Sequence, residues 1–465
     1  MNYTTTTNGA LQYKDSGEKC LDLFSKIGTL RHFSRPQILK MFEEAFKDNS
    51  ELATRVAFWA RAAREGAGER KTFYTIMDEI VRISPEFISD NARALAELGY
   101  WKDLLRYINI PGVVSAFAQA IKDGDRLACK WAPRKCSVLR DKLGMTNKQY
   151  RKWLKKYSDT VEQKMSHSKW SDIQYSSVPG SAMRKYSRAF DKNDSSRFES
   201  WKNDKTSKAS VSATYPHDIW DIRDESLQDK LWNNLPDLLV DSKERILPMI
   251  DVSGSMFGKP IAVAISLGMY LAERNNSDLK DLFLTFSESP ELVKIKGDTL
   301  RERMTSIHCS DWGMNTDFEK AYRRILEIAR ENDVTKDSMP TMLLVLSDMQ
   351  FDESQNNSNG RMMTHLSWIK HEYEQSGYDF PKLVFWNLDA HVGTPARCSD
   401  DNVAMVSGFS PSIMKAILNA EDFNPMDVMM EALNPIELDY TNLNKEFNYS
   451  EVPNVHMGMP EIGCM

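Results

Sequence analysis

The sequence predicts a multidomain protein in which an all-α, HEAT-like helical-repeat region is followed by an α/β domain with a doubly wound, Rossmann-like sheet. Three observations support this. The chain has 465 residues, and at roughly 150 residues per domain this length corresponds to about three domains. In the first half, apolar residues recur at helical spacing. In the second half, short and fully apolar runs alternate with amphipathic segments, which indicates strands that alternate with helices.

The helical region consists of short amphipathic segments separated by glycine and proline. Breaks fall at Gly66, Gly99 and Pro111, residue types that end helices. Helices of about 10–14 residues cannot bury an apolar face alone, so stacked helix pairs are expected. Residues 194–214 are rich in Ser, Lys and Asn, which predicts either a loop or a polar segment that is ordered only by a ligand. The expected helices span residues 36–47, 51–64, 73–83, 90–98, 113–122 and 126–131.

The second half predicts a parallel sheet covered by helices on both faces, because its strands are apolar throughout instead of alternating with polar residues. The predicted domains are a helical-repeat domain over residues 1–240, an α/β domain over 241–425, and a C-terminal helix and tail over 426–465. Strands are expected at 245–251, 282–286, 342–346, 383–386 and 403–406, with helices at 260–274, 298–307 and 317–330.

Charge is distributed unevenly along the chain. The net charge is −6, but residues 1–215 hold 38 basic and 25 acidic side chains, whereas residues 216–465 hold 22 and 41. A basic half favours a polyanionic partner, most often nucleic acid. The alternative is that two oppositely charged domains bind each other.

The basic excess is concentrated in residues 130–156, where ten of 27 positions are Lys or Arg. Tyr150, Trp153 and Tyr157 lie among them, a pattern that suits phosphate contacts combined with base stacking. The alternative is a solvated helix face whose aromatic residues belong to the core. Arg184, Lys185 and residues 202–208 form a second basic region. The candidate RNA-binding residues are Lys130, Arg134, Lys135, Arg151, Lys152, Lys155 and Lys156.

Oxygen ligands follow the predicted strands at their carboxyl ends, where open parallel sheets bind ligands. Asp251, Ser253 and Ser255 follow the first strand, and Asp348 follows the strand at 342–346. Thr316 precedes a predicted helix. Carboxylate and hydroxyl oxygens are hard ligands, so these five residues predict a site for Mg²⁺ or Mn²⁺. The alternative is that Asp251 and the serines cap the next helix.

The residues that follow the first predicted strand do not match common catalytic motifs. The stretch from Gly254 to Pro260 is one residue short of a phosphate-binding P-loop and has Pro where that loop needs a hydroxyl. Neither serine has the flanking glycines of a hydrolase elbow. No general base is evident beside the metal ligands, so a metal-dependent hydrolase is the weaker alternative and a non-enzymatic protein is expected.

The composition also bears on location. No stretch reaches the roughly 18 apolar residues of a membrane span, and the first residues lack the basic start and apolar core of a signal peptide. Six cysteines are scattered without a CxxC pair, which favours a reducing compartment. A cytoplasmic protein without a membrane partner is therefore expected.

The set Asp251-x-Ser253-x-Ser255, Thr316 and Asp348 resembles the metal-ion-dependent adhesion site (MIDAS) of von Willebrand factor A (vWA) domains. The resemblance implies that these residues hold Mg²⁺ and that a carboxylate from a protein partner completes the coordination.

The first half resembles the TROVE module of Ro-type RNA-binding proteins, and most closely a branch of TROVE-like proteins with a vWA domain in viruses, fungi and plants. The resemblance implies helical repeats that close into a ring and bind small structured or single-stranded RNA. The expected function is therefore a non-enzymatic ribonucleoprotein scaffold, and the alternative is a protein–protein adaptor that uses the metal. The matching segments are Thr7-Asn-Gly9-Ala, Leu21-Asp-Leu-Phe24-x-Lys26-Ile-Gly28, residues 58–70, Gly99-Tyr-Trp101-Lys-Asp103 and Lys130-Trp131-Ala-Pro133-Arg134.

Overall fold

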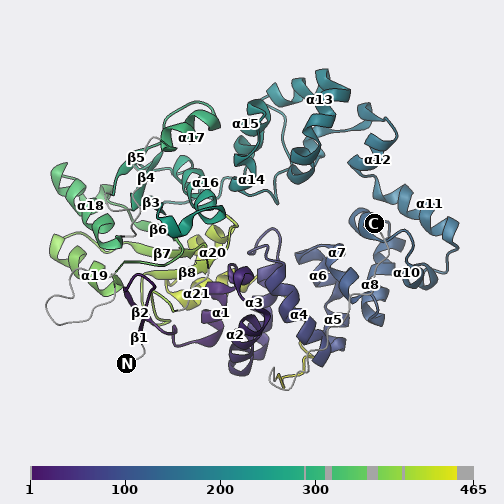
Figure 1. Ribbon diagram of the computed structural model, residues 1–465, viewed down its shortest axis with the longest axis horizontal. Helices are drawn as coiled ribbons and strands as arrows, with labels where there is room; N and C mark the ends of the chain where they lie inside the picture. The colour runs from purple at the N-terminus through teal and green to yellow at the C-terminus, as the bar shows by residue number, and fades with distance from the viewer. Residues whose placement is uncertain (1–2, 287–289, 309–316, 353–364, 390–392, 448–465) are drawn as a thin grey trace. The chain divides into compact units, whose positions relative to one another are not determined.

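The computed structural model describes residues 3–286, 290–308, 317–352, 365–389 and 393–447 (Figure 1). The chain forms two compact units. The α/β unit comprises residues 1–32 and 211–434, and the helical unit comprises residues 33–210 and 435–465. This division differs from the predicted boundaries at 240 and 425, because the first 32 residues and residues 211–240 pack within the α/β unit.

The α/β unit contains a six-stranded sheet with the order β5-β4-β3-β6-β7-β8. All neighbouring pairs are parallel except β4 and β5, which are antiparallel. Every residue of β3, β6 and β8 is buried, as expected for apolar strands covered on both faces. The strands are β3 (Ile246–Asp251), β4 (Leu282–Phe286), β5 (Leu292–Lys294), β6 (Met342–Ser347), β7 (Lys382–Asn387) and β8 (Val403–Ser407).

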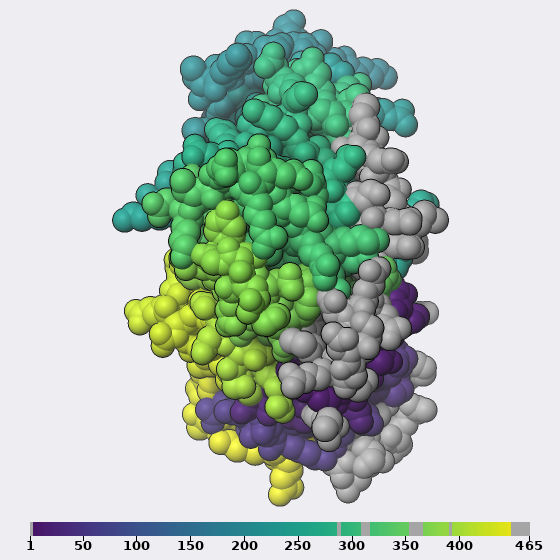
Figure 2. Space-filling view, turned by 90° about the vertical axis from the view of Figure 1, so that its left-hand side faces the viewer, coloured from purple at the N-terminus to yellow at the C-terminus, as the bar shows by residue number. Residues whose placement is uncertain are grey.

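Helices cover both faces of this sheet. In Figure 1, α18 and α19 lie on one side, and α16, α20 and α21 lie on the other. The outer surface of α18 and α19 faces the viewer in Figure 2. The predicted doubly wound α/β domain is confirmed, whereas β5 and α19 were not predicted. The helices of this unit are α1 (Lys19–Ile27), α14 (Pro216–Trp220), α15 (Glu225–Asn233), α16 (Lys259–Glu273), α17 (Leu300–His308), α18 (Phe318–Glu331), α19 (His365–Ser376), α20 (Ile413–Asn419) and α21 (Pro425–Leu433).

Helix α1 packs against the edge strand β8. The Ser407 hydroxyl donates to the carbonyl of Phe24 (3.2 Å) and accepts from the backbone N–H of Gly28 (3.0 Å). A Cβ atom at Gly28 would lie 2.5 Å from the carbonyl oxygen of Ser407, so only glycine permits this approach. The segment that resembles a TROVE motif around Gly28 therefore has a structural role in the α/β unit.

Replacing Gly28 with alanine is expected to destabilise the α/β unit by about 1–3 kcal/mol, because the new methyl group meets backbone atoms that cannot rotate away. Urea unfolding followed by far-ultraviolet circular dichroism measures this loss. The backbone of Gly28 is right-handed helical (φ −68°, ψ −10°), a conformation that alanine also adopts, so the loss isolates the steric contact. Unchanged stability of Gly28→Ala would contradict the packing argument.

The helical unit confirms the predicted succession of short helices. The expected loop at 194–214 differs, because its first part belongs to α13, whose helical backbone is interrupted at Asp194 (φ −149°, ψ 40°). The helices are α2 (Arg35–Asp48), α3 (Ser50–Arg61), α4 (Lys71–Ile83), α5 (Pro85–Asp90), α6 (Ala92–Leu98), α7 (Trp101–Leu104), α8 (Pro111–Lys122), α9 (Arg126–Trp131), α10 (Ser137–Lys142), α11 (Asn147–Ser158), α12 (Val161–Ser166) and α13 (Gly180–Asn203).

A buried ion pair joins α3 to α7 in the helical unit. Arg61 and Asp103 have side chains only 1% and 3% exposed, and Nη2 of Arg61 lies 2.7 Å from Oδ2 of Asp103. Asp103 also accepts from the backbone N–H of Tyr100 (2.9 Å) and from the hydroxyl of Tyr74. Two of the segments that resemble TROVE motifs therefore meet at this pair.

The C-terminal part of the chain belongs to two units. The predicted C-terminal helix corresponds to α21 in the α/β unit. Beyond it, the carbonyl of Ile436 accepts from Nε of Arg55 (3.0 Å), and the carbonyl of Asp439 accepts from the side-chain amide of Asn91 (2.8 Å). The segment after α21 is thus part of the helical unit.

No helix in the described part of the chain is both long enough and apolar enough to cross a membrane.

Candidate metal site and nucleic-acid interface

The candidate metal ligands lie where the order of the strands reverses. From β3 the chain adds β4 and β5 on one side and then crosses to β6 on the other. Such a switch point leaves a crevice at the carboxyl ends of the two central strands. Asp251 is the last residue of β3, and Asp348 directly follows β6. The topology therefore brings these two predicted ligands to one edge of the sheet.

Asp251 is fully buried and held in place by two hydrogen bonds. Its Oδ1 accepts from the backbone N–H of Ser253 (2.9 Å), and its Oδ2 accepts from the hydroxyl of Ser347 (2.6 Å). Ser347 was not among the predicted site residues, although its position beside Asp348 at the strand end was a usable signal. Ser347 orients the carboxylate and accepts in turn from the N–H of Met349 (2.9 Å).

The electrostatics of Asp251 favour a cation. Burial raises the pKa of its carboxyl from 3.8 to about 7, and the nearby Asp348 contributes in the same direction, whereas the hydrogen bonds from Ser253 and Ser347 oppose the shift. None of the groups that shift this pKa is cationic. Two neighbouring buried carboxyl groups are costly to ionise together, and a divalent ion would offset that cost.

The hydroxyl oxygens of Ser253 and Ser255 lie 3.1 Å apart. Adjacent ligands of an octahedral Mg²⁺ ion, with metal–oxygen distances near 2.1 Å, are separated by about 3 Å. The spacing of the two hydroxyls therefore suits neighbouring positions around one ion. Asp251, Ser253, Ser255 and Asp348 would supply the protein oxygens. Thr316, the fifth predicted ligand, lies outside the described residues.

The N-terminal segment holds the loop that carries Asp348. The hydroxyl of Thr6 donates to the carbonyl of Phe351 (2.7 Å), and the N–H of Thr7 donates to the side-chain oxygen of Gln350 (2.8 Å). The side-chain amide of Asn8 donates to the carbonyl of Gln350 (2.9 Å). These residues lie beside β1 (Tyr3–Thr5), which pairs with β2 (Leu11–Tyr13). Sequence reasoning missed this support because the partners are over 340 positions apart.

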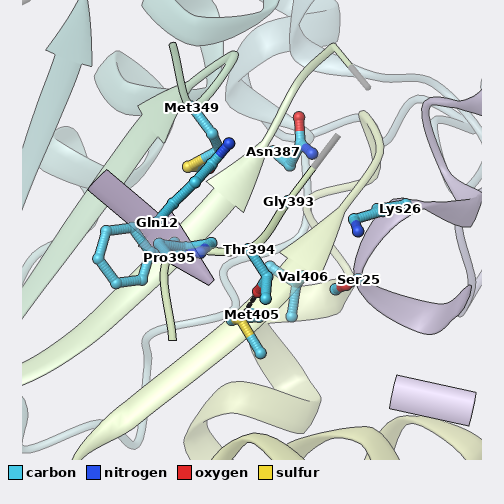
Figure 3. Close-up of a pocket in the computed structure, with 11 residues that line it drawn as sticks. Gln12, Ser25, Lys26, Met349, Asn387, Gly393, Thr394, Pro395, Met405 and Val406 are labelled. Atoms are coloured by element: carbon cyan, nitrogen blue, oxygen red, sulfur yellow. Dashed lines mark hydrogen bonds between the residues drawn. The ribbon is translucent and has the colours of Figure 1, made fainter. Parts of the chain in front are cut away.

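A small pocket opens at the same edge of the sheet, beside β7 and β8 (Figure 3). Gln12 and Lys26 lie on opposite sides of it, with Gly393 and Thr394 between them. Its volume of about 20 Å³ is enough for about one water molecule. Burial lowers the pKa of Lys26, and Asp22 opposes this change. The pocket is too small for a substrate.

The predicted RNA-binding cations gather mainly on α11. Lys148, Arg151, Lys152, Lys155 and Lys156 are all exposed, and this set is called the α11 stripe. Their spacing of three to four residues places them on one face of the helix, over about 12 Å. The helix contains no acidic residue.

The aromatic residues of this region do not lie on the stripe. Tyr150 is 1% exposed, and its hydroxyl donates to the carbonyl of Pro133 (3.2 Å). The indole N–H of Trp153 donates to the carbonyl of Ile121 (2.8 Å), and its ring contacts that of Tyr157 at 4.7 Å. The expected base stacking is wrong for Tyr150, because this ring faces the core; Trp153 and Tyr157 are half-buried.

The remaining predicted cations lie outside α11. Arg134 and Lys135 are exposed between α9 and α10, whereas Lys130 is half-buried, with its Nζ 3.9 Å from Oε1 of Glu162. Within the described residues, no carboxylate lies within ion-pair distance of six of the seven predicted cations. These are Arg134, Lys135, Arg151, Lys152, Lys155 and Lys156.

Comparisons with known proteins cover almost the whole chain. Residues 246–451 match the family described as "Domain of unknown function (DUF7788)", and residues 6–113 and 112–235 match "Domain of unknown function (DUF2828)". These descriptions name neither TROVE nor vWA, so the finer resemblance stays a prediction. Uncharacterized protein L728 of Acanthamoeba polyphaga mimivirus is 26% identical over 518 residues, which cover 96% of this chain and 90% of that protein.

Among the solved structures that match is the crystal structure of the Deinococcus radiodurans Ro (RSR) protein, with 16% identity over 87% of this chain and 92% of that chain. Its TM-score of 0.37 is too low to establish a common fold. The chain is therefore similar along its length to a viral protein and combines regions that resemble two families of domains of unknown function.

Proposed function

We propose that the protein is a non-enzymatic RNA-binding scaffold whose helical unit binds the RNA backbone through the α11 stripe. The observation that carries this proposal is the stripe itself, which presents five exposed cations on one face of a helix without an acidic residue. The helical unit as a whole holds 35 basic and 27 acidic side chains. A surface of this kind attracts phosphates and releases their counterions.

The contacts of the aromatic side chains narrow the proposal. Because Tyr150 is buried and the Trp153 indole is bonded to the protein backbone, the stripe offers charge without stacking platforms. Phosphate contacts alone position a nucleic acid but do not read its sequence. The stripe is therefore a general backbone-binding surface.

Replacing Lys148, Arg151, Lys152 and Lys156 with glutamine is expected to weaken RNA binding and flatten its salt dependence. Four phosphate contacts contribute about −3 to the log–log slope, and the variant, which keeps Lys155, should lose most of this contribution. Fluorescence anisotropy of a labelled RNA hairpin between about 50 and 300 mM salt measures both quantities.

The matched control replaces four exposed cations elsewhere in the helical unit, Lys40, Lys47, Arg64 and Arg93, with glutamine. It removes the same total charge and should retain most of the slope. An unchanged slope in the stripe variant would exclude α11 and move the candidate site to the second basic region around Arg184 and Lys185.

We further propose that Asp251, Ser253, Ser255 and Asp348 hold Mg²⁺ or Mn²⁺ in a vWA-like MIDAS, with Thr316 as a fifth ligand. The supporting observation is the buried Asp251 carboxylate beside Asp348 with two serine hydroxyls in reach of one ion. Bound there, the ion would offer an open position to a carboxylate. The alternative function is therefore a protein–protein adaptor. The four cysteines among the described residues form no disulfide, which favours a reducing, cytoplasmic location.

A further inference from the structure

The helical unit contains a pocket of about 260 Å³ between α9, α12 and the start of α13. Its walls are mostly apolar and include Leu127, Ile173 and Val178. Arg126, Lys130 and Lys164 supply positive charge, and Glu162 supplies a carboxylate. An apolar pocket with a few polar groups is the usual form of a small-ligand site, and this volume is near the lower end of the range.

Two features of the pocket suit a ligand. Leu127 is 42% exposed, and among the described residues of the helical unit only Val138 shares this property with it as a large hydrophobic side chain. Oε2 of Glu162 is buried without a hydrogen-bond partner in the described structure, while Oε1 accepts a long bond from the Tyr186 hydroxyl (3.4 Å). The Glu162 side chain as a whole is 40% exposed, so its carboxylate lies at the rim of the pocket, and Oε2 can accept from a donor that enters it.

We propose that this pocket binds the guanine base of a nucleotide, with Glu162 accepting from the base and the cations contacting its phosphate. Guanine presents two adjacent N–H donors, N1 and N2, on its Watson–Crick edge, which matches the two oxygens of one carboxylate. None of the other bases has two adjacent donors on this edge. Each of them would therefore place an acceptor against one of the two carboxylate oxygens, which would repel that acceptor. The apolar walls cover the faces of the ring.

The cations are arranged for such a ligand. Arg126 donates through Nη2 to the carbonyl of Asp159 (2.9 Å), and Lys164 lies 3.4 Å from the Asp159 carboxylate. Asp159 thereby orients two cations and neutralises only part of their charge. Lys130 is near the outer limit of an ion pair with Glu162 at 3.9 Å. Three cations and one carboxylate leave the pocket with a net positive charge that favours a phosphate.

The pocket adjoins the α11 stripe, so the guanine could belong to an RNA strand that follows the stripe. Helix α9 packs against α11, and α12 lies between α11 and α13 in Figure 1. Nζ of Lys155, on the stripe, lies 3.0 Å from Nε2 of His167, which ends α12. In this form the inference rests on the proposed RNA binding. A free guanine nucleotide would present the same chemistry.

The test uses the full chain and two kinds of probe, guanosine monophosphate and single-stranded uridine oligonucleotides that contain one guanosine, inosine or adenosine. Wild type should bind the guanosine oligonucleotide about 5- to 150-fold more tightly than the adenosine one, since a bidentate contact discriminates by about 1–3 kcal/mol. Inosine lacks the N2 donor and should bind with intermediate affinity. Glu162→Gln should abolish the preference for guanosine while the salt dependence stays unchanged.

Two further variants keep the test decisive. Glu86→Gln changes an exposed carboxylate of the same unit and should leave the preference intact. Ala182→Leu fills the pocket from α13 and should remove the preference without changing Glu162. Guanosine monophosphate measured by calorimetry distinguishes a free nucleotide from a base within RNA, because a pocket for RNA should bind the oligonucleotide much more tightly.

The outcomes separate the two proposals. Equal affinity for the guanosine and adenosine oligonucleotides, with salt-dependent binding retained, would overturn the pocket and leave the stripe standing. Guanosine monophosphate bound by wild type but not by Glu162→Gln, without any oligonucleotide binding, would overturn the proposed function and retain the pocket as a nucleotide site. Binding of neither probe would overturn both.

Discussion

Replacing Asp251 with alanine is expected to abolish Mn²⁺ binding, the largest functional effect expected of a single substitution in the α/β unit. Asp251 supplies a carboxylate at the centre of the site, and its two hydrogen bonds fix the direction of that carboxylate. Removing it leaves Asp348 as the remaining charged ligand. Isothermal titration with Mn²⁺ measures the loss. Ser255→Ala is the matched comparison and should weaken binding less, because it removes only a neutral hydroxyl.

The same site predicts a dependence of stability on pH. Without metal, the raised pKa of Asp251 means that the folded protein binds a proton that the unfolded chain has already released. The free energy of unfolding should therefore fall as pH rises from about 4 to about 7. Mn²⁺ binds the ionised carboxylate, so it should raise the unfolding temperature more at pH 8 than at pH 5. Undiminished Mn²⁺ binding by Asp251→Ala would contradict the assignment.

Replacing Asp103 with alanine is expected to cost about 3–5 kcal/mol of unfolding free energy, because it leaves the guanidinium of Arg61 buried without its partner. Tyr74 and Tyr100 would each lose a hydrogen-bond acceptor in the same step. Urea unfolding measures the change. Asp48→Ala removes an exposed carboxylate of α2 and should stay within about 0.5 kcal/mol of wild type.

A double replacement, Arg61→Met with Asp103→Leu, provides a second check. It removes both charges and fills similar volume with apolar atoms, so it should recover much of the stability that Asp103→Ala loses. If Asp103→Ala is as stable as Asp48→Ala, the prediction is wrong and the ion pair between α3 and α7 does not contribute to the free energy of unfolding.

Local patterns were sufficient for most elements of the fold. The uninterrupted apolar runs that became β3, β4, β6, β7 and β8 exclude a half-exposed sheet, because each has no polar face. The short strand β5 carries no such signal, since its residues are half-buried or exposed. Residues 194–203 are polar by composition, yet they continue α13, because Phe198 and Trp201 are buried in the core of the helical unit.

The candidate metal site was largely accessible from the sequence, because parallel strands align their carboxyl ends and thereby bring Asp251 and Asp348 together. The contacts that hold this site in place could not be predicted from the sequence. The contacts of Thr6, Thr7 and Asn8 join the start of the chain to the loop after β6, more than 340 positions away. Nothing in a local pattern specifies a hydrogen bond between residues so far apart.

In the helical unit, the sequence by itself determined that α11 presents a basic face, since a spacing of three to four residues sets which side chains share one side of a helix. Only the tertiary structure decided what its other face does. Tyr150 enters the core, Trp153 bonds to the end of α8, and α9, α12 and α13 leave a pocket around Glu162. The physical reason is that helix periodicity is a local property, whereas burial and cavities depend on which helices meet, and those contacts join residues distant in the chain.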